Sequence, residues 1–253
     1  MFKGYNLTVS DEYFSAWVPS ARAAHDNSKE EVRKSLNSFF DADGVLSASK
    51  ISDNWFPQIS ADVFISHAHA DSEEAIGLAG WLESNFGLKA FIDSSVWGYS
   101  EKLLRKLDDK YCKSDDGKTY RYETRNKTTS NVHIILSSAL HRMIDSTECV
   151  IFLNTPQSTS FKGHVTEVAT HSPWIFSEIA MTQLIQTRQP QRQQILKSEA
   201  ALESFRADFK IKHDLSLNHL TSIDESDLKD WVGVAKHGHL KSGQALDALY
   251  QLV

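Results

Sequence analysis

From residue 61 onward the chain alternates short apolar runs with longer amphipathic stretches. The apolar runs, which predict strands, lie at 62–66, 88–93 and 149–154. Runs of consecutive apolar residues have no polar face, so they are expected in the middle of a parallel sheet. The amphipathic stretches, which predict helices, lie at 71–86, 100–112, 133–146 and 172–187. Because strands and helices alternate, we predict an α/β fold: a parallel sheet with helices on both faces.

The two ends of the chain give weaker patterns. Residues 1–60 are expected to form an N-terminal helical extension, since apolar residues recur at helical spacing and Ser28–Glu31 has a capping-box pattern. Residues 61–253 are expected to form one domain, in which the polar stretch 113–131 is an insertion that forms a solvated loop. The last quarter predicts a strand within 209–215 and helices at 224–235 and 244–252.

Composition narrows the function classes. The chain has 253 residues and a formal net charge of -6, which argues against a protein built to hold nucleic acid through a basic surface. It has two cysteines, Cys112 and Cys149, far apart and outside any metal-binding spacing. No signal-peptide pattern and no apolar run of membrane-spanning length is present. We therefore expect a cytoplasmic protein with no nucleic-acid or membrane partner.

Polar residues follow each predicted strand. The clusters are 66–67, 93–95 and 154–155. The carboxyl ends of parallel strands meet at one edge of a sheet, where open α/β folds bind their ligands. We favour a ligand site at this edge over the alternative that these are ordinary polar loops.

The first cluster lies within the sequence HAHAD, residues 67–71, which offers a metal-site alternative. Its H-x-H-x-D spacing is that of metallo-β-lactamase-like hydrolases. Ser72 stands where the next histidine of that motif belongs, and the alternation of strands and helices contradicts the β-sandwich of those enzymes. We therefore predict no metal, and treat His67 and His69 as turn residues of which one lies near a ligand.

A glutamate in the helix at 172–187 is the second candidate centre. Trp174 and Glu178 are four residues apart, hence neighbours on a helix that is apolar almost all round. A carboxylate in such a setting needs either a basic partner or a cavity that a ligand enters, and we favour the cavity. One carboxylate beside an aromatic ring suits cleavage of the nicotinamide–ribose bond of NAD, although this pair of residues does not single out NAD as the substrate. Nicotinamide leaves as a neutral molecule, and the carboxylate stabilises the oxocarbenium-like ribose.

Four motifs in this order give the chain a family resemblance. DVFISHAHAD, LKAFIDSSVWGYSEKL, CVIFLN and SPWIFSEI together resemble the Toll/interleukin-1 receptor (TIR) domain over residues 61–188. The resemblance implies a flavodoxin-like parallel sheet, and is closest to bacterial TIR proteins of anti-phage defence. Many of these convert NAD into nicotinamide and an ADP-ribose signal that a downstream effector receives. The segment 1–60 and the insertion depart from a minimal TIR domain.

The resemblance also assigns roles to residues. Glu178 matches the catalytic glutamate, and Trp174 the tryptophan one turn before it. The end of the first strand, which lines the NAD pocket, is Phe64, Ile65, Ser66 and His67. The start of the BB loop, through which TIR domains self-associate, is Asp93, Ser94, Ser95 and Trp97. NAD is then the substrate, and no cofactor is implied.

Three function classes follow, of which a metallohydrolase that uses the HAHAD motif is the least favoured. The first is an NAD glycohydrolase or ADP-ribosyl cyclase, which the presence of Glu178 favours. The alternative is a non-catalytic interaction module, as in animal receptor TIR domains. The product, whether linear, cyclic or conjugated ADP-ribose, and the part of His67 or His69 in activating an acceptor stay open at this point.

Overall fold

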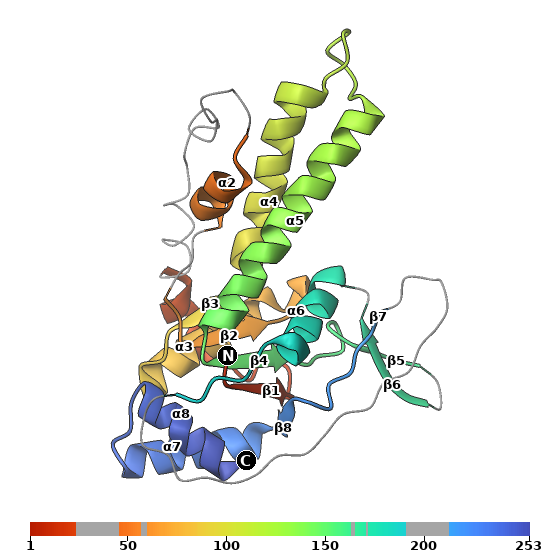
Figure 1. Cartoon of the computed structure of the whole chain (residues 1–253). Helices are drawn as coiled ribbons and strands as arrows, with labels where there is room; N and C mark the ends of the chain where they lie inside the picture. The colour runs from red at the N-terminus through yellow and green to blue at the C-terminus, as the bar shows by residue number, and fades with distance from the viewer. Residues whose placement is uncertain (24–45, 57–59, 163–164, 171, 191–212) are drawn as a thin grey trace. The chain divides into compact units, whose positions relative to one another are not determined.

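A five-stranded, all-parallel sheet forms the centre of the computed structural model, which describes residues 1–23, 46–56, 60–162, 165–170, 172–190 and 213–253. The strands are β1 (Lys3–Leu7), β2 (Val63–Ser66), β3 (Ala90–Ile92), β4 (Cys149–Leu153) and β8 (Thr221–Ile223). Their order across the sheet is β3-β2-β4-β1-β8 (Figure 1). The predicted α/β fold with a parallel sheet is therefore confirmed, as are its three predicted strands.

The strand order is consistent with a flavodoxin-like sheet. In that arrangement the first three strands take the order 2-1-3, with the ligand at the switch point between the first and third. Here β3, β2 and β4 occupy those places. The position beyond β4 is taken by β1, from the start of the chain.

The N-terminal segment is therefore not simply a helical extension, and this prediction was wrong for residues 3–7. β1 pairs in parallel with β4 on one side and with β8 on the other. Glycine and asparagine, at positions 4 and 6, disfavour strands locally, so pairing on both sides decides the conformation. An added Cβ at Gly4 would lie 2.5 Å from Leu220 Cδ2, the end of a flexible side chain, so Leu220 would have to move to accommodate it. The predicted capping box at 28–31 lies outside the described residues.

One face of the sheet is covered by three helices. These are α3 (Ser72–Phe86), α7 (Glu225–His237) and α8 (Gly243–Leu252). Alternate strand residues such as Tyr5, Ile65 and Ile151 join them in one apolar core. Within that core, Phe86 stacks on Trp231 with ring centroids 3.9 Å apart. The helix α3 ends at Gly87, whose φ of 67° is the left-handed conformation predicted for a glycine after a helix.

The opposite face carries α6 (Pro173–Leu184). Its residues Ile175 and Ile179 pack on Phe152 of β4. Ser172 caps the helix by accepting a hydrogen bond from the backbone N–H of Ile175, and proline occupies the first position, as the sequence predicted. Beside α6 lies a small antiparallel sheet of β5 (Ser160–Lys162), β6 (Val165–Thr170) and β7 (His213–Asp214), of which only β7 was predicted.

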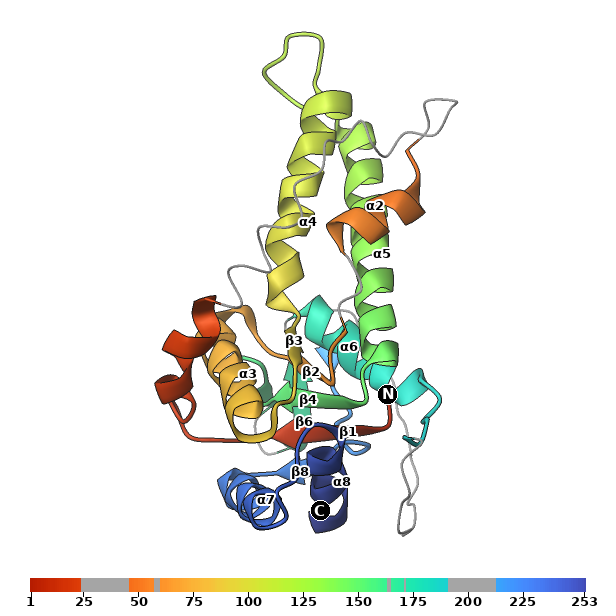
Figure 2. The ribbon, with the colours of Figure 1, turned by 90° about the vertical axis from the view of Figure 1, so that its left-hand side faces the viewer.

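Several further elements of the described chain belong to a second compact unit. They are α2 (Ala48–Trp55), α4 (Ser94–Leu107), the π-helical turn η4 (Asp108–Cys112) and most of α5 (Tyr122–Ser146). Figures 1 and 2 show α4 and α5 side by side as a helical hairpin. Two predictions were wrong here. Helix α4 begins at Ser94, so no loop follows β3, and α5 begins within the predicted insertion, which leaves only 113–121 as a connection.

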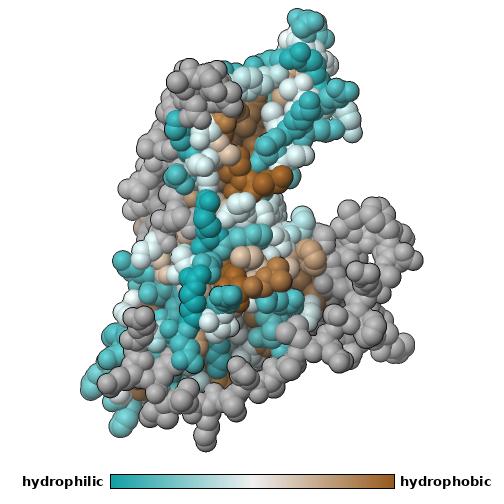
Figure 3. Space-filling model, in the orientation of Figure 1, coloured by the Kyte–Doolittle hydropathy of each residue, from teal (hydrophilic) through white to brown (hydrophobic). Residues whose placement is uncertain are grey.

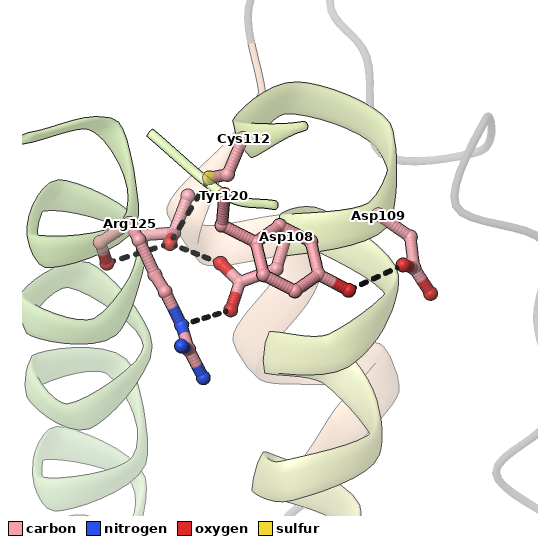
Figure 4. A network of polar contacts seen from close by, with 6 residues as sticks. Asp108, Asp109, Cys112, Tyr120 and Arg125 are labelled. Atoms are coloured by element: carbon pink, nitrogen blue, oxygen red, sulfur yellow. Dashed lines mark hydrogen bonds and ion pairs between the residues drawn. The ribbon is translucent and has the colours of Figure 1, made fainter. Parts of the chain in front are cut away.

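A polar network holds the tip of this hairpin. The buried carboxylate of Asp108 accepts hydrogen bonds from Arg125 Nε at 3.1 Å and from Thr128 Oγ1 at 2.6 Å (Figure 4). The hydroxyl of Tyr120 donates to Asp109 at 2.7 Å. The bonds of Asp108 join η4 to α5.

None of the described helices is both long enough and apolar enough to span a bilayer.

Candidate functional site

Ser66 and Glu178 meet under the carboxyl edge of the sheet. The Ser66 hydroxyl donates a hydrogen bond of 2.7 Å to Glu178 Oε2. Ser66 is 0% exposed and Glu178 1% exposed, so this pair is closed off from bulk water. The structure thus brings together two predicted site residues that are 112 positions apart in the chain.

Local structure explains why these two side chains face each other. Side chains alternate along a strand, so Ser66 shares the face of Phe64, which is the face that α6 covers. On α6 the buried residues are Ile175, Glu178, Ile179 and Thr182, a stripe with helical spacing. The cap at Ser172 fixes where the helix starts and therefore which residues point to the sheet. Glu178 lies in the middle of this stripe.

His67 adds a buried imidazole next to the pair. It is 0% exposed. Burial lowers the pKa of His67 to about 4, and the carboxylates of Glu178 and Asp71 oppose this shift. The ring is therefore neutral at neutral pH although two acidic side chains are close enough to favour its charged form.

Asp71 extends the site along the sheet edge. It closes the short helix η3 (His69–Asp71) after β2, and its Oδ2 accepts a hydrogen bond of 2.5 Å from Thr155 Oγ1. Thr155 follows β4, so this bond ties together the segments after two neighbouring strands. The backbone N–H groups of Gln157 and Ser158 donate to the same threonine hydroxyl, which fixes the turn.

A cleft of about 180 Å³ opens at this edge, beside Asp71 and Thr155. Its lining is Val9, Ser10, Asp11, Glu12, Ala70, Asp71, Glu73, Glu74 and Thr155. Carboxylates dominate, and burial together with neighbouring acids raises the pKa of Glu74. Such a cleft repels phosphate groups and favours a cationic or hydroxyl-rich part of a ligand.

The other predicted site residues have different positions. Trp174 lies on α6 one turn before Glu178 and is partly exposed. Phe64 is buried against Phe91, with ring centroids 5.5 Å apart. The resemblance had implied that Ile65 lines the same pocket as Glu178. Its side chain instead points to the opposite face of the sheet and belongs to the core under α3, so it does not share the Glu178 site.

The predicted BB-loop residues belong to the second unit. Asp93 is buried directly after β3, and Ser94, Ser95 and Trp97 fall in the first turns of α4. The site described above is therefore built from residues of the first unit only.

Residues of the N-terminal segment were not among the predicted site residues, because β1 itself was not predicted. Val9 to Glu12 follow β1 and line the cleft. The only signal was the alternation of KGYNL, which two strand-disfavouring residues obscured.

The metal-site alternative gains no support from the geometry. Among the described residues, no three His, Cys, Asp or Glu side chains are arranged to hold a metal ion. The parallel α/β sheet also differs from the β-sandwich of the hydrolases that share the H-x-H-x-D spacing.

Comparisons with models of protein families, with curated proteins and with solved structures found no match to this chain.

Proposed function

We propose that this protein cleaves NAD at the bond between nicotinamide and ribose, with Glu178 as the catalytic carboxylate, and releases nicotinamide and an ADP-ribose-type product. The observation that carries the proposal is the position of Glu178. It is 1% exposed, lies under the end of β2 beside the flavodoxin-like switch point, and is held by Ser66. An acidic side chain this deeply buried is uncommon unless it is paired or functional.

The chemistry needs little more than a fixed negative charge. Nicotinamide departs as a neutral molecule, so no general acid has to protonate it. The ribose left behind develops oxocarbenium character, which a preorganised carboxylate stabilises. The Ser66 hydroxyl fixes the Oε2 end of Glu178 and so sets the orientation of the carboxylate. Exclusion of water from this site strengthens the electrostatic effect.

The neighbouring groups are compatible with this role. Trp174, one turn before Glu178, offers an aromatic face on which a nicotinamide ring can stack. The acidic cleft that Asp71 lines does not include Glu178, and its charge favours a cationic group over a diphosphate. We assign a secondary role to the neutral imidazole of His67: it can take a proton from the molecule to which the ADP-ribose group is transferred.

We place this activity in a cytoplasmic, bacterial anti-phage pathway whose product signals to a downstream effector, because that is what the TIR resemblance implies. Self-association through residues 93–97 belongs to the same proposal. A non-catalytic interaction module is the second candidate. It is favoured by the apolar surface over α6, where Phe176 and Leu184 are exposed (Figure 3).

Incubation of the full chain with NAD, followed by chromatography and mass spectrometry, tests the proposal. Glu178→Gln keeps the size of the side chain and an acceptor for Ser66, so the fold should survive while nicotinamide release falls at least ~100-fold. Glu83→Gln, on the exposed side of α3, is the matched control and should retain full turnover. Undiminished release by the Glu178→Gln variant would exclude Glu178 as the catalytic group and leave the interaction module.

A further inference from the structure

The turn at 215–220, which joins β7 to β8, lies against α6. Its two ends, Leu215 and Leu220, are buried and join Ile175 and Ile179 of α6 in one apolar cluster. Between them, His219 is half-buried and contacts the last turns of the helix. This turn therefore packs on the helix that carries Glu178.

Hydrogen bonds around His219 define where its proton lies. Gln183 Nε2 donates to the backbone carbonyl of Ser216 at 3.0 Å, which fixes the orientation of its amide. The same Nε2 lies 3.3 Å from His219 Nδ1, so Nδ1 must be the unprotonated acceptor. The hydroxyl of Thr182 donates to the carbonyl of Ile179 at 2.7 Å and therefore accepts from His219 Nε2–H, also at 2.7 Å.

A neutral imidazole with its hydrogen on Nε2 satisfies the bonds to Thr182 and to Gln183 together. A second proton on Nδ1 would face the amide hydrogens of Gln183 and break that contact. Burial lowers the pKa of His219, while the carbonyl of Ser216 opposes the shift. The groups that contact the ring, from Thr182, Gln183 and Ser216, are uncharged. The titratable residues on the elements packed here are Glu178 on α6 and His213 and Asp214 on β7.

We propose that His219 is a positioning residue. As a neutral imidazole it holds α6, and with it Glu178, against the sheet through its hydrogen bonds to Thr182 and Gln183, which together we call the latch. Protonation of His219 at low pH breaks the contact with Gln183 and so releases the latch. Thr182 is one turn beyond Glu178 on the same buried stripe, so a bond at Thr182 acts on the segment that presents the carboxylate. The latch rests on geometry alone. Its effect on turnover rests on the proposed function.

Hydrogen exchange of the peptide spanning 173–184, measured by mass spectrometry on the full chain, tests the latch itself. At pH 7.5 we expect His219→Ala to speed exchange about 5-fold to 10-fold, the effect of losing one hydrogen bond. Thr182→Val, which keeps the shape and removes the acceptor, should do the same. His237→Gln, an exposed histidine on α7, is the control and should change nothing.

The pH dependence gives the second readout. After correction for intrinsic exchange rates, protection of α6 in the wild type should fall as pH drops below about 6.5, the value for an unperturbed histidine. His219→Gln, which keeps a donor for Thr182 and does not titrate, should reduce this dependence and leave only the part that His67 contributes. Unchanged exchange in both His219→Ala and Thr182→Val, or equal acid loss in wild type and His219→Gln, overturns the proposal.

Turnover separates this proposal from the proposed function. If the latch acts through Glu178, His219→Ala lowers kcat for nicotinamide release, and the acid side of the kcat profile flattens in His219→Gln. If Glu178→Gln keeps full turnover while exchange responds as expected, the enzyme assignment fails and the latch stands. If exchange does not respond while Glu178→Gln is inactive, the latch fails and the enzyme assignment stands.

Discussion

The hydrogen bond between Ser66 and Glu178 can be measured by a double-mutant cycle. Ser66→Ala removes the donor at the end of β2. Glu178→Leu removes the carboxylate and leaves an apolar side chain among the apolar residues of α6. The cycle compares the cost of Ser66→Ala in the wild type with its cost in the Glu178→Leu background, so contributions unrelated to the bond cancel.

The structure sets the expected magnitude. The two oxygens are 2.7 Å apart, and both side chains are at most 1% exposed. If Glu178 is ionised, as the proposed function requires, a hydrogen bond to it contributes about 1.5–3 kcal/mol, and removing one partner leaves the other without its buried bond. We expect Ser66→Ala to lower the free energy of unfolding by about 2–3 kcal/mol in the wild type. In the Glu178→Leu background, where no carboxylate is left to accept the bond, the same change should cost less than about 1 kcal/mol.

Urea unfolding at 25 °C and neutral pH, followed by tryptophan fluorescence and far-UV circular dichroism, provides the measurement. Coincident transitions by the two probes justify a two-state treatment. Ser84→Ala, on the exposed side of α3, should change stability by less than about 0.5 kcal/mol. A coupling energy below about 0.5 kcal/mol would show that the two side chains do not stabilise each other, and the reasoning about a preorganised carboxylate would fail.

Three further predictions concern stability. The pKa of His67 is about 4 in the folded state and near 6.5 in the unfolded state, so its neutral form contributes roughly 3 kcal/mol to the free energy of unfolding, a contribution that is complete above pH 6.5 and lost as pH falls toward 4. Urea midpoints measured against pH should show this loss and His67→Gln should reduce it, whereas an identical pH dependence in the variant contradicts the prediction. Gly77→Ala places a Cβ 2.5 Å from the backbone oxygen of Phe14 and should cost about 1–3 kcal/mol in the same assay; a neutral effect would mean that this contact relaxes freely. Asp108→Asn weakens the bond to Arg125 and should lower the free energy of unfolding by about 1–2 kcal/mol and speed hydrogen exchange at the hairpin tip; unchanged exchange there would count against the network.

Much of the first unit follows from local patterns. The apolar runs at 62–66 and 149–154 predicted central strands, because residues with no polar face must be buried on both sides. Ser172 with Pro173 predicted the start of α6, and that start sets which residues of the helix face the sheet. The position of Glu178 in a buried stripe could thus be predicted from the sequence, as could Ser66 at the end of a strand.

Other features depended on partners far away in the chain. KGYNL is a weak strand by itself and becomes β1 only through its pairing with β4 and β8. Residues 94–99 were expected to form a loop, but they form the first turns of α4. The contact between Thr182 and His219, which are 37 residues apart, could not be predicted from the sequence pattern of either segment.

The sequence alone therefore determined the class of fold, the main strands and helices, and the two residues at the centre of the candidate site, because burial and helix capping act over a few neighbouring residues. Only the tertiary structure decided the strand order, the cleft after β1 and the hydrogen bond between Ser66 and Glu178. These depend on strand pairing and side-chain packing between distant segments, and local preference carries no information about such contacts.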